Sequence, residues 1–394
     1  MSDVSHPGTD SVSLTQGGPF FRVERRVGLT RAGTVPLVLR AGLSIAIAFV
    51  PLVLLSAAQG LLVGTQVTLP LAVDLTVYAR FLLAVPLMLY AERWIDFRVA
   101  LAVNQFRTGN LLQGGAQEGF EAAVRRLERT RDSFFPEIIL LVVAVALAWT
   151  NSRAGLGPDV SSWRVLTPGM YESLTWAGRW VELVSLPFFN FLVLRWLWRI
   201  LVWSRFLWNV SRLDLNLLPT HPDGAGGLAF LGLMHTAFGA FLIPLAASVA
   251  ARGVQWVQYG GGDIQSLRNA LIAFGVIALL VTLGPLQVFM PRLVVVKRNG
   301  LLEYGRLATE YTRGFDRKWL RDPREETLLG TADLQSLADL GNSYAFVRGM
   351  RIFPLSYQNA LALLLSAALP MLPFLLAILP LEELLKRLFQ LVMR

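Results

Sequence analysis

Long runs without any charged residue constrain this chain more than any other feature. Residues 41–64 and 270–291 contain no Asp, Glu, Lys or Arg. Each run reaches the roughly 20 residues that a helix needs to cross a bilayer core. Only helices and closed barrels satisfy their own backbone in lipid, and runs of this length lack the alternation of a barrel strand. The predicted fold class is therefore an all-α, polytopic membrane bundle with short cytoplasmic amphipathic helices.

The composition supports this class, because only 16% of the residues are charged, against about 25% in soluble globular chains. Six to seven transmembrane segments are expected. The apolar segments lie at about 37–63, 78–96, 135–151, 180–198, 226–250, 269–290 and 357–380. The second is the weakest, because Arg80, Glu92 and Arg93 shorten its uncharged part. Whether it and the last segment span fully is open.

The distribution of Lys and Arg predicts the orientation. Five Arg precede or begin the first span, and 22 more Lys or Arg lie in residues 91–135, 195–225 and 291–356. The alternate loops, 151–179 and 251–268, carry only five. Because basic loops stay inside, the N-terminus and the three basic stretches are expected to be cytoplasmic. In the fourth span, Trp180 and Trp196 are expected in aromatic belts at opposite interfaces, with Arg195 and Arg199 at the cytoplasmic one.

Four regions follow from this pattern. Residues 1–35 are expected to form a disordered cytoplasmic tail, and residues 36–290 a six-span membrane domain with a helical insertion at about 97–134. Residues 291–356 should form a basic cytoplasmic helical segment, whose apolar stripes at 301–315 and 334–347 pack on each other or lie on anionic lipid. Residues 357–394 are predicted to form a seventh span or re-entrant hairpin followed by an amphipathic tail, which leaves the side of the C-terminus open.

The loop HPDGAGG is the best-defined polar cluster. A ligand reading places a cation or phosphate at His221, Asp223 and the glycines Gly224, Gly226 and Gly227. A structural reading is favoured, in which Asp223 caps the next helix and the glycines permit a tight turn. A single histidine without a GK[ST] ending is neither a metal site nor a phosphate-binding loop.

Three polar residues are predicted inside the membrane. His235 lies nine residues after Gly226 and is expected near the bilayer midplane, where an ionisable group is a functional hypothesis. The alternative is a neutral imidazole bonded to a neighbouring helix, with Asn190 as one partner. Asn190 and Gln287 are expected to form interhelical hydrogen bonds. Prolines interrupt six of the seven spans: Pro51, Pro86, Pro187, Pro244, Pro285 and Pro370. Broken helices of this kind can line a transport site.

Several functional classes are excluded or disfavoured. Because the chain has no cysteine and only three histidines, a metal site is not expected. No enzyme motif or cofactor-binding motif is present, so no cofactor or catalytic residue is expected and an enzyme is disfavoured. The net charge of +9 lies at predicted membrane interfaces, which argues against nucleic acid as a partner. The expected partners are anionic membrane lipids, with a second copy of the chain or a cytoplasmic protein as further possibilities.

Three blocks, HPDGAGGL (221–228), GTADLQSLADLGNSY (330–344) and PLEELLKRLF (380–389), resemble those of a group of uncharacterised bacterial polytopic inner-membrane proteins. The resemblance covers about a tenth of the chain. It implies a location in the bacterial cytoplasmic membrane and no particular activity.

Three functions are compatible with the sequence. The first is a transport or channel-like protein with a path lined by proline-kinked helices and His235. The second is a non-transporting scaffold that recruits a partner or lipid through its basic segments. The third is a membrane-embedded enzyme that acts on a lipid or lipid-linked substrate through His221 and Asp223.

Overall fold

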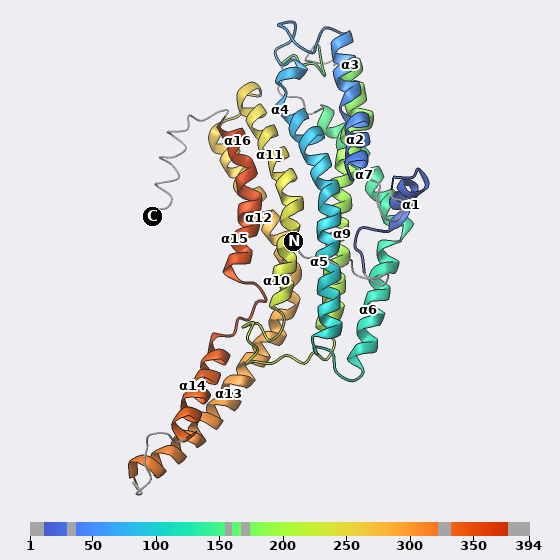
Figure 1. Ribbon diagram of the computed structural model, residues 1–394. Coiled ribbons are helices and arrows are strands. Elements are labelled where there is room, and N and C mark those ends of the chain that lie inside the picture. Colours follow the sequence, from blue (N-terminus) through green and yellow to red (C-terminus); the bar gives the residue numbers. More distant parts are fainter. Residues whose placement is uncertain (1–11, 30–36, 154–159, 167–173, 322–331, 377–394) are drawn as a thin grey trace.

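The computed structural model describes residues 12–29, 37–153, 160–166, 174–321 and 332–376. These residues fold mainly into helices, and no β-strand occurs among them (Figure 1). The α-helices are α1 (Gly18–Arg26), α2 (Leu37–Ala48), α3 (Val50–Ala58), α4 (Leu75–Val77), α5 (Val85–Thr108), α6 (Ala116–Arg131), α7 (Phe134–Arg153), α8 (Trp176–Trp180), α9 (Leu186–Ser211), α10 (Ala229–His235), α11 (Gly239–Tyr259), α12 (Ile264–Leu283), α13 (Met290–Phe315), α14 (Ala332–Gly349), α15 (Tyr357–Ala368) and α16 (Leu372–Leu375). Short 3-10 or π-helical segments join them: η1 (Leu71–Val73), η2 (Tyr78–Ala84), η3 (Val181–Ser185), η4 (Thr236–Phe238), η5 (Gly284–Phe289), η6 (Asp316–Arg321) and η7 (Leu369–Met371).

Six helical stretches are long and apolar enough to cross a membrane. They are Leu37–Ala58, Leu75–Thr108, Trp176–Ser211, Ala229–Tyr259, Ile264–Arg321 and Tyr357–Leu375. A seventh arises if α6 and the part of α7 up to Thr150, which are bent by 44° at their junction, count as one span. The all-helical class and the number of candidate spans therefore agree with the sequence analysis. The PLEELLKRLF block and the expected amphipathic tail lie outside the described residues.

The core of the bundle is built on α5, α9 and α11, which run side by side through its centre (Figure 1). The ring of Trp196 on α9 stacks on Phe241 of α11, with 5.5 Å between centroids. Trp196 is only 1% exposed, whereas Trp176 at the start of α8 is 59% exposed. The prediction that Trp196 lies in an aromatic belt at a membrane interface is therefore wrong. Its indole N–H donates to the carbonyl of Met88 inside the core.

Two π-helical segments precede the long central helices. η2 is followed by Pro86 in α5, and η3 by Pro187 in α9. A proline has no N–H to donate to the carbonyl four residues earlier, and its ring crowds that carbonyl. The preceding turn widens in both helices, so the prolines are local breaks in otherwise continuous spans. We call the end of the bundle where α4 begins the Asp74 end, and the end where α5 finishes the Arg107 end.

The N-terminal segment differs from the expected disordered tail. Residues 12–26 form a segment that ends in α1, and Val12, Leu14 and Thr15 are each at most 4% exposed. The segment lies across the bundle beside α6 and α7 (Figure 1). We call residues 12–26 the N-terminal strap. Residues 1–11 and 30–36 of the expected tail lie outside the described residues.

The basic segment 291–356 projects from the bundle. α13 continues beyond the bundle from α12 and η5, and α14 folds back along it (Figure 1). Tyr344 of α14 lies against Gly305, and Val347 lies against Gly300. The apolar stripes of this segment were expected either to pack on each other or to lie on anionic lipid. In the structure they pack on each other. We call residues 290–321 and 332–349 the arm.

Candidate functional site

A cluster of buried charges lies between the strap and the central helices. Glu92 of α5 accepts hydrogen bonds from three arginines: Arg199 at 2.9 Å, Arg40 at 3.0 Å and Arg195 at 3.4 Å. The side chains of Glu92, Arg195 and Arg199 are at most 9% exposed. Because Arg195 and Arg199 are four residues apart on α9, both face α5 from one side of the helix. One carboxylate thus holds α2, α5 and α9 together.

Two further carboxylates complete the cluster. Arg40 also donates to Glu24 of the strap at 2.7 Å, and the guanidinium of Arg195 lies 3.4 Å from Glu137 of α7. Burial and the neighbouring Glu92 raise the pKa of Glu24 above its ordinary value, although the contact with Arg40 opposes this shift. One carboxylate oxygen of Glu24 is buried without a hydrogen-bond partner. We call Glu24, Arg40, Glu92, Glu137, Arg195 and Arg199 the ionic cluster.

The strap closes over the ionic cluster through its backbone. The N–H groups of Leu14 and Thr15 donate to Asp96 of α5 at 2.8 and 2.9 Å, and the hydroxyl groups of Ser13 and Thr15 donate to the same carboxylate. In the other direction, Arg199 donates to the carbonyl of Thr15 at 3.3 Å. Backbone groups that would otherwise be orphaned by burial are therefore paired.

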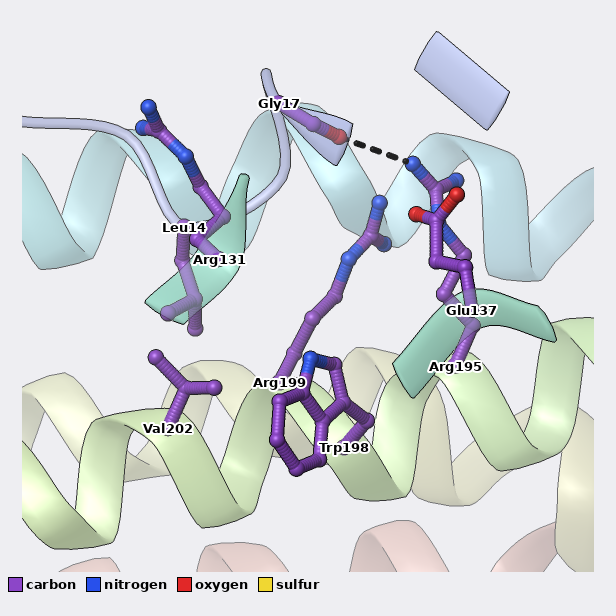
Figure 2. A pocket seen from close by; sticks show the side chains of 8 residues that line it. All are labelled: Leu14, Gly17, Arg131, Glu137, Arg195, Trp198, Arg199 and Val202. Atoms are coloured by element: carbon purple, nitrogen blue, oxygen red, sulfur yellow. Dashed lines mark hydrogen bonds and ion pairs between the residues drawn. The ribbon is translucent and has the colours of Figure 1, made fainter. Parts of the chain in front are cut away.

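Figure 2 shows the small space left at this contact, where Arg195 reaches the carbonyl of Gly17 beside Glu137. The space is about 10 Å³, which is about the volume that one water occupies. Leu14, Arg131, Trp198, Arg199 and Val202 complete its lining. The neighbouring carboxylates of Glu92 and Glu137 are each paired with at least one arginine. The evident role of the cluster is to hold the strap and four helices in one arrangement.

The HPDGAGG loop adopts a closed turn at the Arg107 end. Asp223 accepts hydrogen bonds from the N–H groups of Ala225, Gly227 and Ala229 at 2.8–3.1 Å. Burial of Asp223 opposes its ionisation, but these three donors outweigh burial and lower its pKa below the ordinary value. Nδ1 of His221 lies 2.9 Å from the Asp223 carboxylate. The structure thus brings His221 and Asp223 together. The Asp223 carboxylate accepts from the N–H of Ala229, the first residue of α10, although the N-cap position itself is Leu228.

The glycines of this loop occupy positions that other residues would strain. Gly224, Gly226 and Gly227 have φ values of +63°, +66° and +98°, which L-residues with a Cβ rarely adopt. A Cβ on Gly226 would also lie 3.1 Å from Met350. Arg351 donates to the carbonyl of Asp223 at 2.6 Å, so the loop is joined to the segment after the arm. These contacts agree with the structural reading, and the ligand reading stays a prediction.

His235 is held by two neighbours. Its Nδ1 lies 2.6 Å from the carbonyl of Thr282, and its Nε2 lies 3.1 Å from the indole N–H of Trp203. Because Trp203 can only donate, His235 accepts at Nε2 and donates from Nδ1, which is the neutral imidazole. The partner is therefore not Asn190, whose amide donates to the carbonyl of Ala144 at 3.2 Å. Gln287 is exposed on η5.

The expected depth of His235 near the bilayer midplane stays a prediction. Its partner Thr282 lies 18 residues after Ile264, the first residue of α12, which corresponds to about 27 Å along the helix. This distance is close to the roughly 30 Å thickness of a bilayer core. Within the candidate span Ala229–Tyr259, His235 is the seventh of 31 residues and so lies toward the start of that helical stretch.

His235→Ala is expected to lower the free energy of unfolding by about 2–4 kcal/mol, because two buried groups would lose their partner. Chemical denaturation of the purified protein in detergent, followed by tryptophan fluorescence, measures the change. His221→Ala is the control, since that side chain is 42% exposed. Equal stability of the two variants would contradict the structural role of His235.

A second polar network lies at the Asp74 end. Asp74 accepts from the indole N–H of Trp163 at 2.9 Å and from the amide of Gln255 at 2.8 Å, and it caps α4 through Thr76 and Val77. Arg164 lies 3.5 Å from the same carboxylate. The sequence pattern did not single out this network. A buried carboxylate held by uncharged donors and one arginine ties α4 to α11 at the Asp74 end.

Within the described residues, no group of three or more His, Asp or Glu side chains could hold a metal ion. The features that the chain brings together are thus the strapped ionic cluster, the capped loop and the projecting arm. Comparisons with protein-family models, with curated proteins and with solved structures find no match for this chain.

Proposed function

We propose that the protein is a multi-pass membrane scaffold that presents the arm to a cytoplasmic protein partner. The observation that carries the proposal is the helical unit Ile264–Arg321 of 58 residues. Its first part is apolar and its second part, α13, leaves the bundle together with α14 (Figure 1). The unit is nearly three times as long as the roughly 20 residues that a bilayer core requires, so a membrane span and a projecting arm are joined without a flexible linker.

The surface of the arm supports a protein partner. Leu302, Leu320 and Phe346 are 69%, 70% and 57% exposed, although the arm extends away from the apolar spans. Exposed apolar side chains among charged ones are typical of an interaction surface. The arm carries nine basic side chains (Arg292, Lys297, Arg298, Arg306, Arg313, Arg317, Lys318, Arg321 and Arg348) and five acidic ones (Glu303, Glu310, Asp316, Asp333 and Asp339). We therefore infer that the partner offers an acidic face around an apolar patch.

The location belongs to the same proposal. The 27 Lys or Arg at the N-terminus and in the three basic stretches favour a cytoplasmic Arg107 end, N-terminus and arm. The resemblance noted from the sequence favours a bacterial cytoplasmic membrane. Anionic lipids on that face would contact the basic stretches, and a second copy of the chain is an alternative partner for the arm.

Replacing Arg313 and Arg317 by glutamate is expected to reduce partner binding at least about tenfold, because negative charges would then face the acidic surface of the partner. Photo-crosslinking from position 302 in cells, followed by purification of the full-length protein, measures the bound partner. The matched control is Arg125→Glu with Arg129→Glu, an exposed pair with the same four-residue spacing on α6. Equal crosslinking in both double variants would overturn the proposal, and a crosslink only to a second copy would identify the arm as an oligomer contact.

Transport is the second candidate, and one observation favours it. The central helices α5 and α9 each carry a π-helical segment followed by a proline, and such breaks recur at functional sites in transporters. Against this, His235 is fully buried with both ring nitrogens bonded. Solute flux into proteoliposomes that His235→Ala abolishes without unfolding the protein would favour transport over the scaffold.

A further inference from the structure

An apolar groove lies between α9 and the break after α12. It has a volume of about 640 Å³ and is lined by one face of α9, from Leu197 to Trp208, and by residues 280–288. The break has a clear cause, since Pro285 lacks the N–H that would continue α12 and the chain passes into the 3-10 segment η5. At Gly284 a Cβ would meet nothing within 4 Å. The missing side chain leaves the floor of the groove open.

The groove is apolar toward the span and polar toward the Arg107 end. Leu201 and Leu280 are each 60% exposed on its walls. Farther along α9 the lining includes Ser204, Arg205 and Trp208. The guanidinium of Arg212 lies over the ring of Trp208, 4.5 Å from its centroid. The apolar part of the groove matches the acyl chain of a phospholipid, and the tryptophan and two arginines at its end match the headgroup phosphate.

The depth of the groove agrees with this polarity. Leu280 lies 16 residues after Ile264, about 24 Å along α12, and is still within the length of a bilayer core. Arg205 lies ten residues beyond Arg195 on α9, in the direction of the Arg107 end. The apolar half of the groove thus lies at the depth of acyl chains, and Arg205 lies at the depth of headgroups.

We propose that this groove binds an anionic phospholipid, with one acyl chain between Leu201 and Leu280 and its headgroup phosphate at Arg205 and Arg212. The site is separate from the arm and does not depend on the partner proposed above. Two independent features select the ligand: the apolar groove favours an acyl chain, and the pair of arginines at one end of the groove favours an anionic headgroup.

Native mass spectrometry of the full-length protein in detergent tests the site, by titration with phosphatidylglycerol and with phosphatidylcholine of the same chains. The wild-type protein should retain phosphatidylglycerol more tightly. Arg205→Gln should weaken that binding about fivefold, the contribution of one arginine near an anionic lipid headgroup. It should weaken phosphatidylcholine binding less, because the choline ammonium offsets the charge of that lipid's phosphate. Arg125→Gln, an exposed arginine on α6, is the control.

Gly284→Leu tests the acyl-chain half. Gly284 has helical φ and ψ angles of −49° and −41°, so leucine can adopt its conformation and would fill the groove. Each displaced methylene should reduce affinity about fourfold, so both lipids should bind at least about tenfold more weakly. Gly275→Leu is the matched control, since Gly275 is on α12, which ends directly before Gly284, and also has open space around its Cβ position. Unchanged lipid binding in Gly284→Leu, or equal wild-type affinity for both lipids, would overturn the proposal.

Discussion

Replacing Glu92 by glutamine is expected to reduce the free energy of unfolding by about 3–5 kcal/mol, the usual cost of removing one partner from a buried ion pair. Glu92 is the carboxylate that Arg40, Arg195 and Arg199 share. Glutamine keeps the shape of the side chain but leaves these arginines without that compensating charge. Chemical denaturation in detergent, followed by tryptophan fluorescence, gives the change.

The control is Glu121→Gln. Glu121 pairs with Arg107 at 2.8 Å, but both side chains are about 30% exposed, so its loss should cost less than about 1 kcal/mol. The double variant Glu92→Gln with Arg199→Gln should be less destabilised than the sum of the two single variants, because it removes one of the uncompensated charges. If Glu92→Gln were no more damaging than Glu121→Gln, the ionic cluster would not stabilise the bundle.

The sequence predicted the helices of this protein better than the contacts between them. Uncharged runs predict helices directly, because an apolar segment of sufficient length has few other structures open to it. Arg195 and Arg199 were expected to reach water at an interface, and the structure instead places them against Glu92. Two features of the sequence could have predicted this contact: the four-residue spacing of the two arginines on an apolar helix, and a glutamate inside the second apolar segment. Charges within spans usually pair with one another.

The strap could not be predicted from local pattern. Residues 12–17 have no helical or strand periodicity, and they are held through backbone groups that bond to Asp96 and Arg199. Any sequence supplies such backbone groups, so only the three-dimensional arrangement reveals the contact. The start of the fifth span could not be read from local pattern either. The sequence count starts at Gly226, whereas the helical stretch Ala229–Tyr259 begins three residues later and, at 31 residues, is longer than the roughly 20 residues of a bilayer core.

Asp96→Ala is expected to release the strap and to accelerate its cleavage by trypsin at least about tenfold. Asp96 accepts hydrogen bonds from two backbone N–H groups and two hydroxyls of residues 13–15, and bonds to a charged acceptor contribute about 1.5–3 kcal/mol each. Arg22, Arg25 and Arg26 are exposed on α1, but a protease cleaves a helical segment only after local opening. Mass spectrometry of the fragments locates and times the cleavage after these arginines.

Two further variants separate release of the strap from general unfolding. Thr15→Val removes one hydroxyl donor from the strap itself and leaves α5 intact, so it should accelerate the same cleavage by a smaller factor without lowering global stability. Asp214→Ala, which removes an exposed carboxylate, should leave the rate unchanged. Since Arg199 contacts both Glu92 and the carbonyl of Thr15, opening of the strap should also expose the ionic cluster to water. Cleavage at the wild-type rate in Asp96→Ala would mean that the strap is held by Glu24 and its contact with Arg40 instead.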